Sequence, residues 1–271
     1  MDQLFSVSGE IVVITGGMGQ LGRSYATAFL ERGAKVAILD LQIDGDMFNS
    51  HFGSWKQQGK AIGLSCDILN KKRVQECADE IINLLGTPTV LINNAALDSP
   101  PDATASENGP FEDYPEISFE KVMDVNVKGT FLCCQVFGGL MAKGIGGSII
   151  NISSIYGMVS PDQSLYEYRR QKGEAFYKPA SYAVSKSAIF NLTRYLAVYW
   201  GKKNVRVNTL TLAGVFNNQD SSFLTAYCGR IPVGRMAEST EYNGAVVFLA
   251  SKASAYMTGS NLIVDGGWTS I

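Results

Sequence analysis

Two side chains in the second half of the chain have the types and the spacing that proton transfer requires. Tyr182 and Lys186 are four residues apart, so a helix would place the phenol and the ammonium group on one face. A nearby ammonium group lowers the pKa of a phenol, which allows a tyrosine to act as a general acid or base. The same spacing occurs twice more, at Tyr168/Lys172 and Tyr199/Lys203. Only Tyr182 begins a long apolar helical stretch after a strand-like run ending in two serines, so chemistry is predicted there.

A glycine-rich turn near the start of the chain predicts a dinucleotide site. Gly17, Gly19 and Gly22 follow a β-branched run and lead into a helical stretch, which is the context that the G-x-G-x-x-G pattern requires. Glycine permits the tight turn and lets backbone N–H groups approach a pyrophosphate at the helix N-terminus. The alternative is a glycine-rich turn that binds no ligand.

An acidic residue at the end of the second predicted strand indicates which dinucleotide binds. Asp40 lies 18 residues beyond Gly22, where a carboxylate can bind the ribose 2′-hydroxyl and would repel a 2′-phosphate. Neither Gly19 nor the segment 41–43 supplies a cation for such a phosphate. NAD is therefore favoured over NADP, although a solvated acid at a strand end is the alternative.

Short β-branched runs alternate with helical stretches along the whole chain. Strands are predicted at 10–14, 35–39, 61–65, 89–93, 147–152, 205–210 and 261–264, and helices near 20–32, 45–58, 70–85, 118–142, 181–200 and 239–250. This alternation predicts an α/β fold, a doubly wound, Rossmann-type three-layer sandwich with a seven-stranded parallel sheet, in one domain over 1–271. Insertions near 98–117 and 158–180 interrupt the pattern, and 216–235 is the expected substrate loop.

Composition excludes several other classes of protein. Apolar residues make up 46% of the chain and the net charge is −2 with no basic block, so nucleic-acid binding is not expected. No bilayer-spanning apolar run and no signal peptide is expected, which makes the cytoplasm the predicted compartment. The five cysteines lack C-x-x-C spacing and His51 is the single histidine, so neither a metal site nor a disulfide framework is predicted.

Together these motifs resemble the short-chain dehydrogenase/reductase family, in its single-domain branch. The resemblance is carried by the glycine turn, Asp40, Cys66-Asp67-Ile68, Asn93-Asn94-Ala95-Ala96, Asp124-Val125-Asn126-Val127, Asn151-Ile152-Ser153-Ser154, Tyr182 to Lys186, and Val264-Asp265-Gly266-Gly267. It implies an NAD-dependent oxidoreductase that transfers a hydride between nicotinamide and a secondary alcohol or ketone.

The resemblance also implies roles for four catalytic residues. Tyr182 would be the general acid/base, and Lys186 would lower its pKa and bind the nicotinamide ribose. Ser154, preferred to Ser153, would hydrogen-bond the substrate oxygen. Asn126 would hold a water that relays protons to Lys186, the alternative being a buried amide at a local kink.

The same resemblance assigns the remaining ligand contacts. The predicted cofactor-binding residues are Gly16, Gly19, Gln20, Leu21, Asp40, Leu41, Asp67, Ile68, Asn94, Ala95, Ala96, Tyr182, Lys186, Val215 and Asn217, with Val215 acting through its backbone on the carboxamide. The predicted substrate-binding residues are Ser154, Tyr182, Arg169 and Arg170.

Three features depart from the family pattern. Gln20 stands where the single-domain branch has a glycine, and Leu212-Ala213 replaces the usual Pro-Gly. Ser154 and Tyr182 are 28 residues apart, more than the usual spacing, so the extra segment should lie over or beside the active site.

That extra segment offers the clearest indication of substrate. Arg169 and Arg170 could hold a phosphate or carboxylate, or belong to a solvated loop or subunit contact. Asp98 or Asp102 could line the same mouth, or lie on the surface. A weaker resemblance to oxidoreductases of flagellin-modification and surface-glycan pathways favours a polar, sugar-like substrate and a role in carbohydrate biosynthesis.

Two other functions remain open at this stage. The glycine spacing matches nucleotide-sugar epimerases and dehydratases, which need a larger carboxyl-terminal domain, whereas Leu212-Ala213 would suit a non-catalytic NAD-binding protein. The helices near 118–142 and 181–200 correspond to those through which the family forms dimers and tetramers, so a homo-oligomer is expected, with a homotetramer as the specific form.

Overall fold

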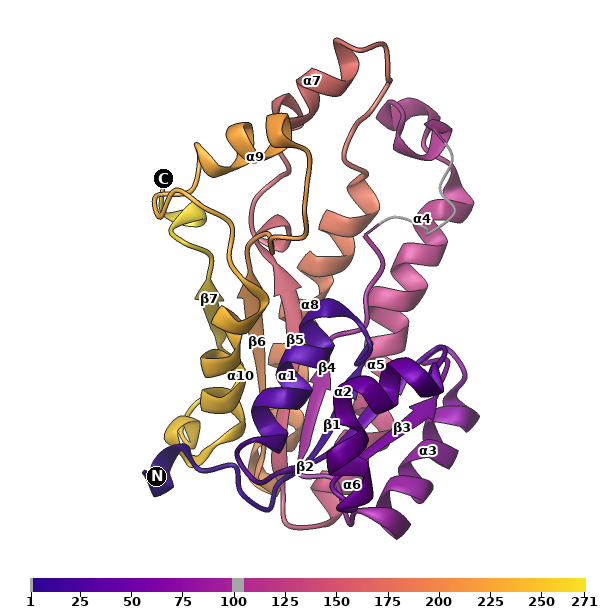
Figure 1. Cartoon of the computed structure of the whole chain (residues 1–271), viewed down its shortest axis with the longest axis vertical. Helices are drawn as coiled ribbons and strands as arrows, with labels where there is room; N and C mark the ends of the chain where they lie inside the picture. Colours follow the sequence, from indigo (N-terminus) through magenta and orange to yellow (C-terminus); the bar gives the residue numbers. More distant parts are fainter. Residues whose placement is uncertain (1, 99–104) are drawn as a thin grey trace.

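Seven parallel strands form the central sheet of the molecule. The computed structural model describes residues 2–98 and 105–271, and within them the strand order is β3-β2-β1-β4-β5-β6-β7 (Figure 1). The strands are β1 Ile11–Thr15, β2 Lys35–Asp40, β3 Ala61–Ser65, β4 Val90–Asn93, β5 Gly147–Ser154, β6 Val205–Leu212 and β7 Asn261–Val264. The predicted sheet is confirmed, and β5 and β6 each extend two residues further than expected.

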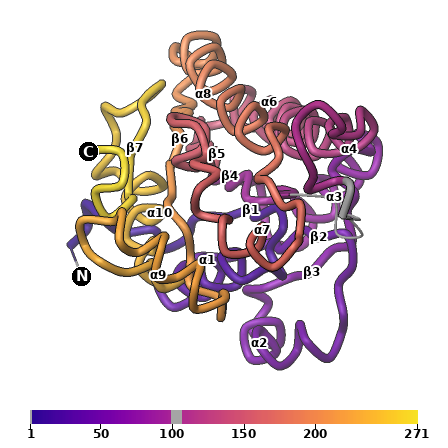
Figure 2. The backbone as a smooth tube through the Cα atoms, turned by 90° about the horizontal axis from the view of Figure 1, so that it is seen from above, coloured from indigo at the N-terminus to yellow at the C-terminus, as the bar shows by residue number. Residues whose placement is uncertain are grey.

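Helices cover both faces of this sheet, which confirms the three-layer architecture. The main helices are α1 Gln20–Leu30, α2 Gly45–Gln57, α3 Lys71–Leu84, α4 Glu116–Met123, α5 Thr130–Cys133, α6 Gly139–Lys143, α8 Ala180–Trp200 and α10 Asn243–Ala250. Figure 2 shows α1, α2 and α10 on one side of the strands and α4, α6 and α8 on the other. The strand order reverses between β1 and β4, and in such sheets ligands bind beyond the carboxyl ends of the strands at this point.

The helix predicted over 118–142 is a helical run from 116 to 143 with two π-helical segments, Asp124–Gly129 and Cys134–Gly138. Each segment ends at a tightly packed glycine. A Cβ on Gly129 would lie 2.5 Å from the Ile68 side chain, and one on Gly138 would lie 2.5 Å from the Trp200 ring. Contrary to the sequence analysis, this run is long and apolar enough to span a bilayer by length and composition, but half of its most apolar window is buried, as in a core helix.

Two further helices lie beyond the carboxyl ends of the strands, where the sequence predicted only loops. These are α7 Glu167–Arg170, in the insertion near 158–180, and α9 Ser221–Cys228, in the predicted substrate loop (Figure 1). An apolar cluster joins them: the rings of Tyr166 and Phe223 stack at 5.7 Å, and those of Phe223 and Tyr227 stack at 5.2 Å. The insertion therefore packs against the substrate loop above the sheet.

Candidate active site

The glycine turn between β1 and α1 can be built only with glycine at its two key positions. Gly16 has φ +61°, and a Cβ there would lie 2.8 Å from the Ala95 Cα. A Cβ on Gly22 would lie 2.4 Å from the Gly16 carbonyl oxygen. A Cβ on Gly19 would lie 3.3 Å from the same Gly16 carbonyl oxygen, a tight contact but a less severe one. The turn has the close packing that a pyrophosphate site at the start of a helix needs.

Asp40 fixes the turn from the end of β2. Its two carboxylate oxygens accept hydrogen bonds from the N–H groups of Met18 (2.9 Å) and Leu41 (2.8 Å). Asp40 also lines a small cavity with Gly19 and Arg23, and the Arg23 guanidinium donates to the Met18 carbonyl. Arg23 is thus a cation beside the predicted ribose site that the sequence analysis did not identify.

The loop after β4 is joined to the glycine turn by a small hydrogen-bond network. Asn94 donates its side-chain amide to the carbonyls of Thr15 (3.1 Å) and Gly16 (3.0 Å). The Thr15 hydroxyl accepts from the N–H groups of Asn94 and Ala95, both at 3.1 Å. Asn94 and Ala96 line the main cavity, as predicted for cofactor contacts.

The remaining predicted cofactor residues differ in exposure and in whether they line the main cavity. Asp67 and Leu41 are exposed, Ile68 is buried, and the exposed Asn217 does not line the main cavity. Val215 does line it, but its carbonyl oxygen accepts a hydrogen bond from the Gln219 side chain at 2.8 Å. A carboxamide contact made through the Val215 carbonyl would share that oxygen with Gln219.

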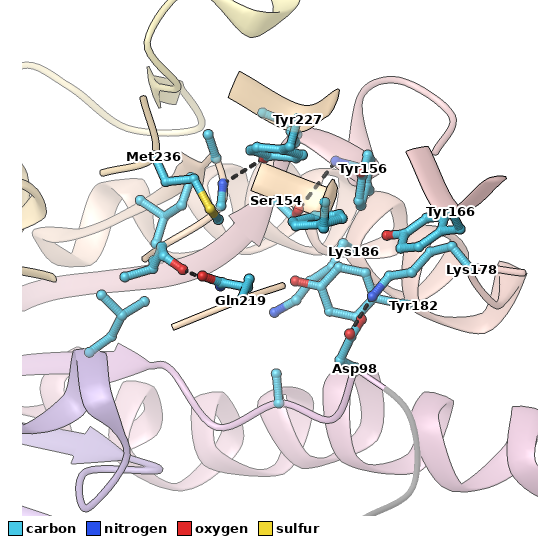
Figure 3. Close-up of a pocket in the computed structure, with 18 of the residues that line it drawn as sticks. Asp98, Ser154, Tyr156, Tyr166, Lys178, Tyr182, Lys186, Gln219, Tyr227 and Met236 are labelled. Atoms are coloured by element: carbon cyan, nitrogen blue, oxygen red, sulfur yellow. Dashed lines mark hydrogen bonds and ion pairs between the residues drawn. The ribbon is translucent and has the colours of Figure 1, made fainter. Parts of the chain in front are cut away.

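A cavity of about 580 Å³ opens beyond the carboxyl ends of the strands and contains the predicted catalytic group. Ser154 comes from the end of β5, and Tyr182 and Lys186 from the first turns of α8; all three line the cavity (Figure 3). Gly157 makes this approach possible, because a Cβ there would lie 2.8 Å from the Lys186 backbone. The residues predicted from two separate motifs thus converge, together with Asn94 and Leu21 from the nucleotide side.

The two consecutive serines at the end of β5 have different roles. The Ser153 hydroxyl donates to the Lys186 carbonyl at 2.9 Å and holds α8 against the strand. The Ser154 oxygen accepts from the Tyr156 N–H at 3.2 Å, so its O–H can donate into the cavity, on the side where Tyr182 lies. This geometry supports the preference for Ser154 as the substrate contact.

Burial sets the protonation of the tyrosine and the lysine. Burial lowers the pKa of Lys186 from 10.5 to about 8, opposed by the negative charge of Asp98. Burial also raises the pKa of Tyr182 above its usual range, the Asp98 carboxylate adds to this, and the Ser154 hydroxyl lowers it. Contrary to the sequence analysis, Lys186 is not among the groups that lower the pKa of Tyr182, and desolvation dominates and keeps the phenol protonated.

Asn126 lies in the first π-helical segment, and three protein groups bind its side chain. The amide accepts from the Leu97 N–H (2.7 Å) and donates to the Leu97 carbonyl (2.8 Å) and the Ser185 hydroxyl (2.9 Å). These bonds connect the loop after β4 to α8, at the helix turn that carries Tyr182 and Lys186. They correspond to the structural alternative for Asn126, and the water-holding role stays a prediction.

The two arginines predicted to bind substrate are separated by the structure. Arg169 lines the cavity, but it forms an ion pair with Glu174 at 2.6 Å and lies over the Phe176 ring at 3.8 Å. Arg170 pairs with Glu167 at 2.7 Å and donates to the carbonyls of Gln163 and Phe176, so it stabilises the insertion instead of lining the cavity. Neither guanidinium is left uncompensated for an anionic substrate.

Several cavity residues were missed because no local pattern marks them. The far wall is aromatic and is formed by Tyr156, Tyr166, Phe176, Phe223 and Tyr227, from the turn after β5, the insertion and α9. Asp98, which the sequence analysis named as a possible lining residue, does line the cavity and forms an ion pair with Lys178, whereas Asp102 lies outside the described residues. Gln20, the departure from the glycine pattern, donates to the Phe216 carbonyl at 2.8 Å and so connects α1 to the substrate loop.

Comparison with known proteins gives consistent matches over nearly the whole chain. A family model described as enoyl-(acyl carrier protein) reductase matches residues 16–269. The chain is 30% identical to D-threitol dehydrogenase of Mycolicibacterium smegmatis, over 98% of this chain and 95% of that one, and 28% identical to NAD-dependent glycerol dehydrogenase of Listeria innocua, over 99% and 97%. A short chain dehydrogenase from Leptospira borgpetersenii, solved with bound NAD+, is 34% identical with a TM-score of 0.81, over 97% and 93% of the two chains.

Proposed function

The chain belongs to the short-chain dehydrogenase/reductase family, and we propose that it transfers a hydride between NAD and a secondary alcohol group of a polyol, or the matching ketose. The observation that carries this proposal is the convergence of Ser154, Tyr182 and Lys186 in one cavity beyond the sheet. The relatives named as threitol and glycerol dehydrogenases act on small polyhydroxylated alcohols, which supports a substrate of the same kind.

The residues around the turn fit a dinucleotide. The tight glycine turn leaves the N-terminus of α1 free for a pyrophosphate, and Asp40 ends β2 at the position where a ribose hydroxyl would be bound. Asn94, Ala95 and Ala96 lead from this turn to the cavity, where the nicotinamide end would be held. When bound, NAD supplies a ring carbon that accepts the hydride from the alcohol carbon.

Three side chains carry the proton and orient the alcohol. The Ser154 O–H donates to the substrate oxygen, because the Tyr156 N–H already occupies an acceptor position of that serine. For the oxidation Tyr182 must first release its own proton to solvent; the phenolate then takes the hydroxyl proton as hydride leaves the carbon, and in the reduction the phenol gives that proton to the carbonyl oxygen. Lys186, still largely protonated at pH 7 with a pKa of about 8, favours the phenolate that forms next to it.

Net turnover of the cofactor separates this proposal from its two rivals. Purified protein with NAD is given threitol, arabinitol, xylitol, glycerol and a nucleotide sugar in turn, and both the absorbance of reduced nicotinamide and the conversion of each compound are followed. Formation of NADH supports the dehydrogenase. Conversion of a nucleotide sugar without net NADH would favour an epimerase or dehydratase, and tight NAD binding with no conversion would favour a non-catalytic protein.

An apolar strip on α8 supports a homo-oligomer. Tyr195, Val198 and Tyr199 are 64%, 86% and 62% exposed, and the rings of the two tyrosines stack at 6.1 Å. Large apolar side chains grouped on one helix face are typical of a contact surface. Light scattering at several protein concentrations measures the oligomer size, and a monomer at all of them would contradict this part of the proposal.

A further inference from the structure

An ion pair from two distant segments lies beside the catalytic tyrosine. Lys178, just before α8, pairs with Asp98, from the loop after β4, and both side chains line the cavity (Figure 3). The Lys178 ammonium lies 5.2 Å from the centre of the Tyr182 ring. The Lys178 side chain is only 12% exposed, whereas that of Asp98 is 57% exposed. The pair thus presents a held cation and an accessible carboxylate to whatever Tyr182 binds.

The backbone of Lys178 is held in place by one side chain of the insertion. The Gln163 amide oxygen accepts from the Lys178 N–H at 2.8 Å, and its amide nitrogen donates to the Lys178 carbonyl at 3.0 Å. Burying an ammonium group is costly unless it is paired, so the ion pair and this double hydrogen bond together fix the lysine. The arrangement has the rigidity of a binding site and differs from that of a solvated surface lysine.

The charge balance of the cavity favours hydroxyl groups over an anion. Among the described residues that line it, Lys178 is matched by Asp98 and Arg169 by Glu174. The third cation among them, Lys186, is buried beside Tyr182, and Asp220 adds a further carboxylate to the lining. A phosphate or carboxylate would have to displace one of these acidic partners. A hydroxyl group needs no displacement, because it can donate to an exposed carboxylate oxygen and accept from an ammonium group at the same time.

We propose, on the basis of the function proposed above, that Asp98 and Lys178 bind a second hydroxyl group of the substrate, next to the carbon oxidised at Tyr182. The aromatic side chains of Tyr166, Phe176 and Phe223 form the wall on which the carbon chain packs. The pair acts as a specificity determinant: it favours vicinal diols and their hydroxyketones over simple secondary alcohols. A site built to hydrogen-bond a substrate hydroxyl discriminates against an analogue without that hydroxyl, because its polar groups are then left unpaired.

The test compares a polyol with an analogue that lacks one hydroxyl. A small polyol is paired with the simple secondary alcohol that lacks the hydroxyl beside the reacting carbon, as 1,2-propanediol is paired with 2-propanol. We expect wild-type kcat/KM to favour the polyol by at least tenfold, since charged hydrogen bonds are involved. In Lys178→Met and Asp98→Asn this ratio should fall to about threefold or less, while Lys178→Arg should keep most of it.

A second ion pair of the same insertion provides the matched control. Asp162 pairs with Arg230 and does not line the cavity, so Arg230→Met removes an equivalent contact away from the substrate. We expect this variant to keep the wild-type ratio, and the thermal midpoint of every variant reports whether the fold is retained.

Two results would overturn the inference. One is a wild-type ratio retained in both Lys178→Met and Asp98→Asn, and the other is an equal loss on both substrates. Failure of the proposed function has a different signature, because the wild-type protein would then form no NADH from any alcohol of the panel.

Discussion

Replacing Lys186 with methionine is expected to abolish turnover and yet to make the protein more stable at pH 7. The Lys186 residue is 4% exposed, and its ammonium group donates to the Ile152 carbonyl at 2.9 Å. Asp98, the acidic group that acts on it, is paired with Lys178. The protein therefore holds a buried charge with little direct compensation, next to the tyrosine that needs it.

The size of this effect follows from the difference between the folded and unfolded pKa. Burial lowers the pKa of Lys186 from 10.5 to about 8, so between these values the unfolded state binds more protons and stability rises with pH. At pH 7 the buried charge costs about 3 kcal/mol, and at pH 10 about 1 kcal/mol. Losing the bond to Ile152 costs about 1 kcal/mol. Lys186→Met should thus gain about 2 kcal/mol at pH 7 and about none at pH 10.

Equilibrium urea denaturation of both proteins at pH 7 and pH 10, followed by tryptophan fluorescence, measures these differences. The difference between variant and wild type isolates Lys186 from the buried thiols and phenols, which titrate equally in both. Lys172→Met is the matched control. Lys172 is exposed and lies 5.5 Å from the Tyr168 ring, in a pair with the same four-residue spacing, so its loss should change stability little at either pH.

The result that would refute this reasoning is a Lys186→Met variant no more stable than wild type at pH 7. A gain of equal size at both pH values would also refute it, because the buried charge would then not be its source.

Three further predictions concern the cofactor and the proton. Tyr182→Phe should abolish turnover with NAD affinity changed less than about twofold by titration; an active variant would exclude the acid/base role. Asp40→Ala should weaken NAD and improve NADP, since Arg23 then faces the 2′-position without a competing carboxylate; unchanged preference in kcat/KM would contradict this. Gln20→Ala should raise protease cleavage in 216–235 by losing the Phe216 bond, and unchanged cleavage would show that the loop is held elsewhere.

The order of the strands and helices along the chain, and the residues at the strand ends, could be predicted from sequence. Each buried strand is a short apolar run, and the glycine turn and Asp40 lie directly at strand ends. Residues that are neighbours in sequence are therefore enough to predict the strands, the turn and the position of Asp40. The choice of Tyr182 from three tyrosine–lysine pairs also depended on neighbours, namely the preceding strand and the apolar helix. The same reasoning did not predict the two π-helical segments in the run from 116 to 143, which end at Gly129 and Gly138, where the helix packs closely against side chains distant in sequence.

Only the tertiary structure decided which residues line the cavity around Tyr182. Arg169 and Arg170 are adjacent in sequence, but only Arg169 lines the cavity. The Arg170 guanidinium instead donates hydrogen bonds to backbone carbonyls of its own insertion. Asp98 and Lys178 are 80 residues apart, and no sequence pattern connects them. Local sequence sets backbone conformation through steric and hydrogen-bonding preferences of adjacent residues, whereas substrate specificity depends on which distant side chains folding brings to the same few ångströms.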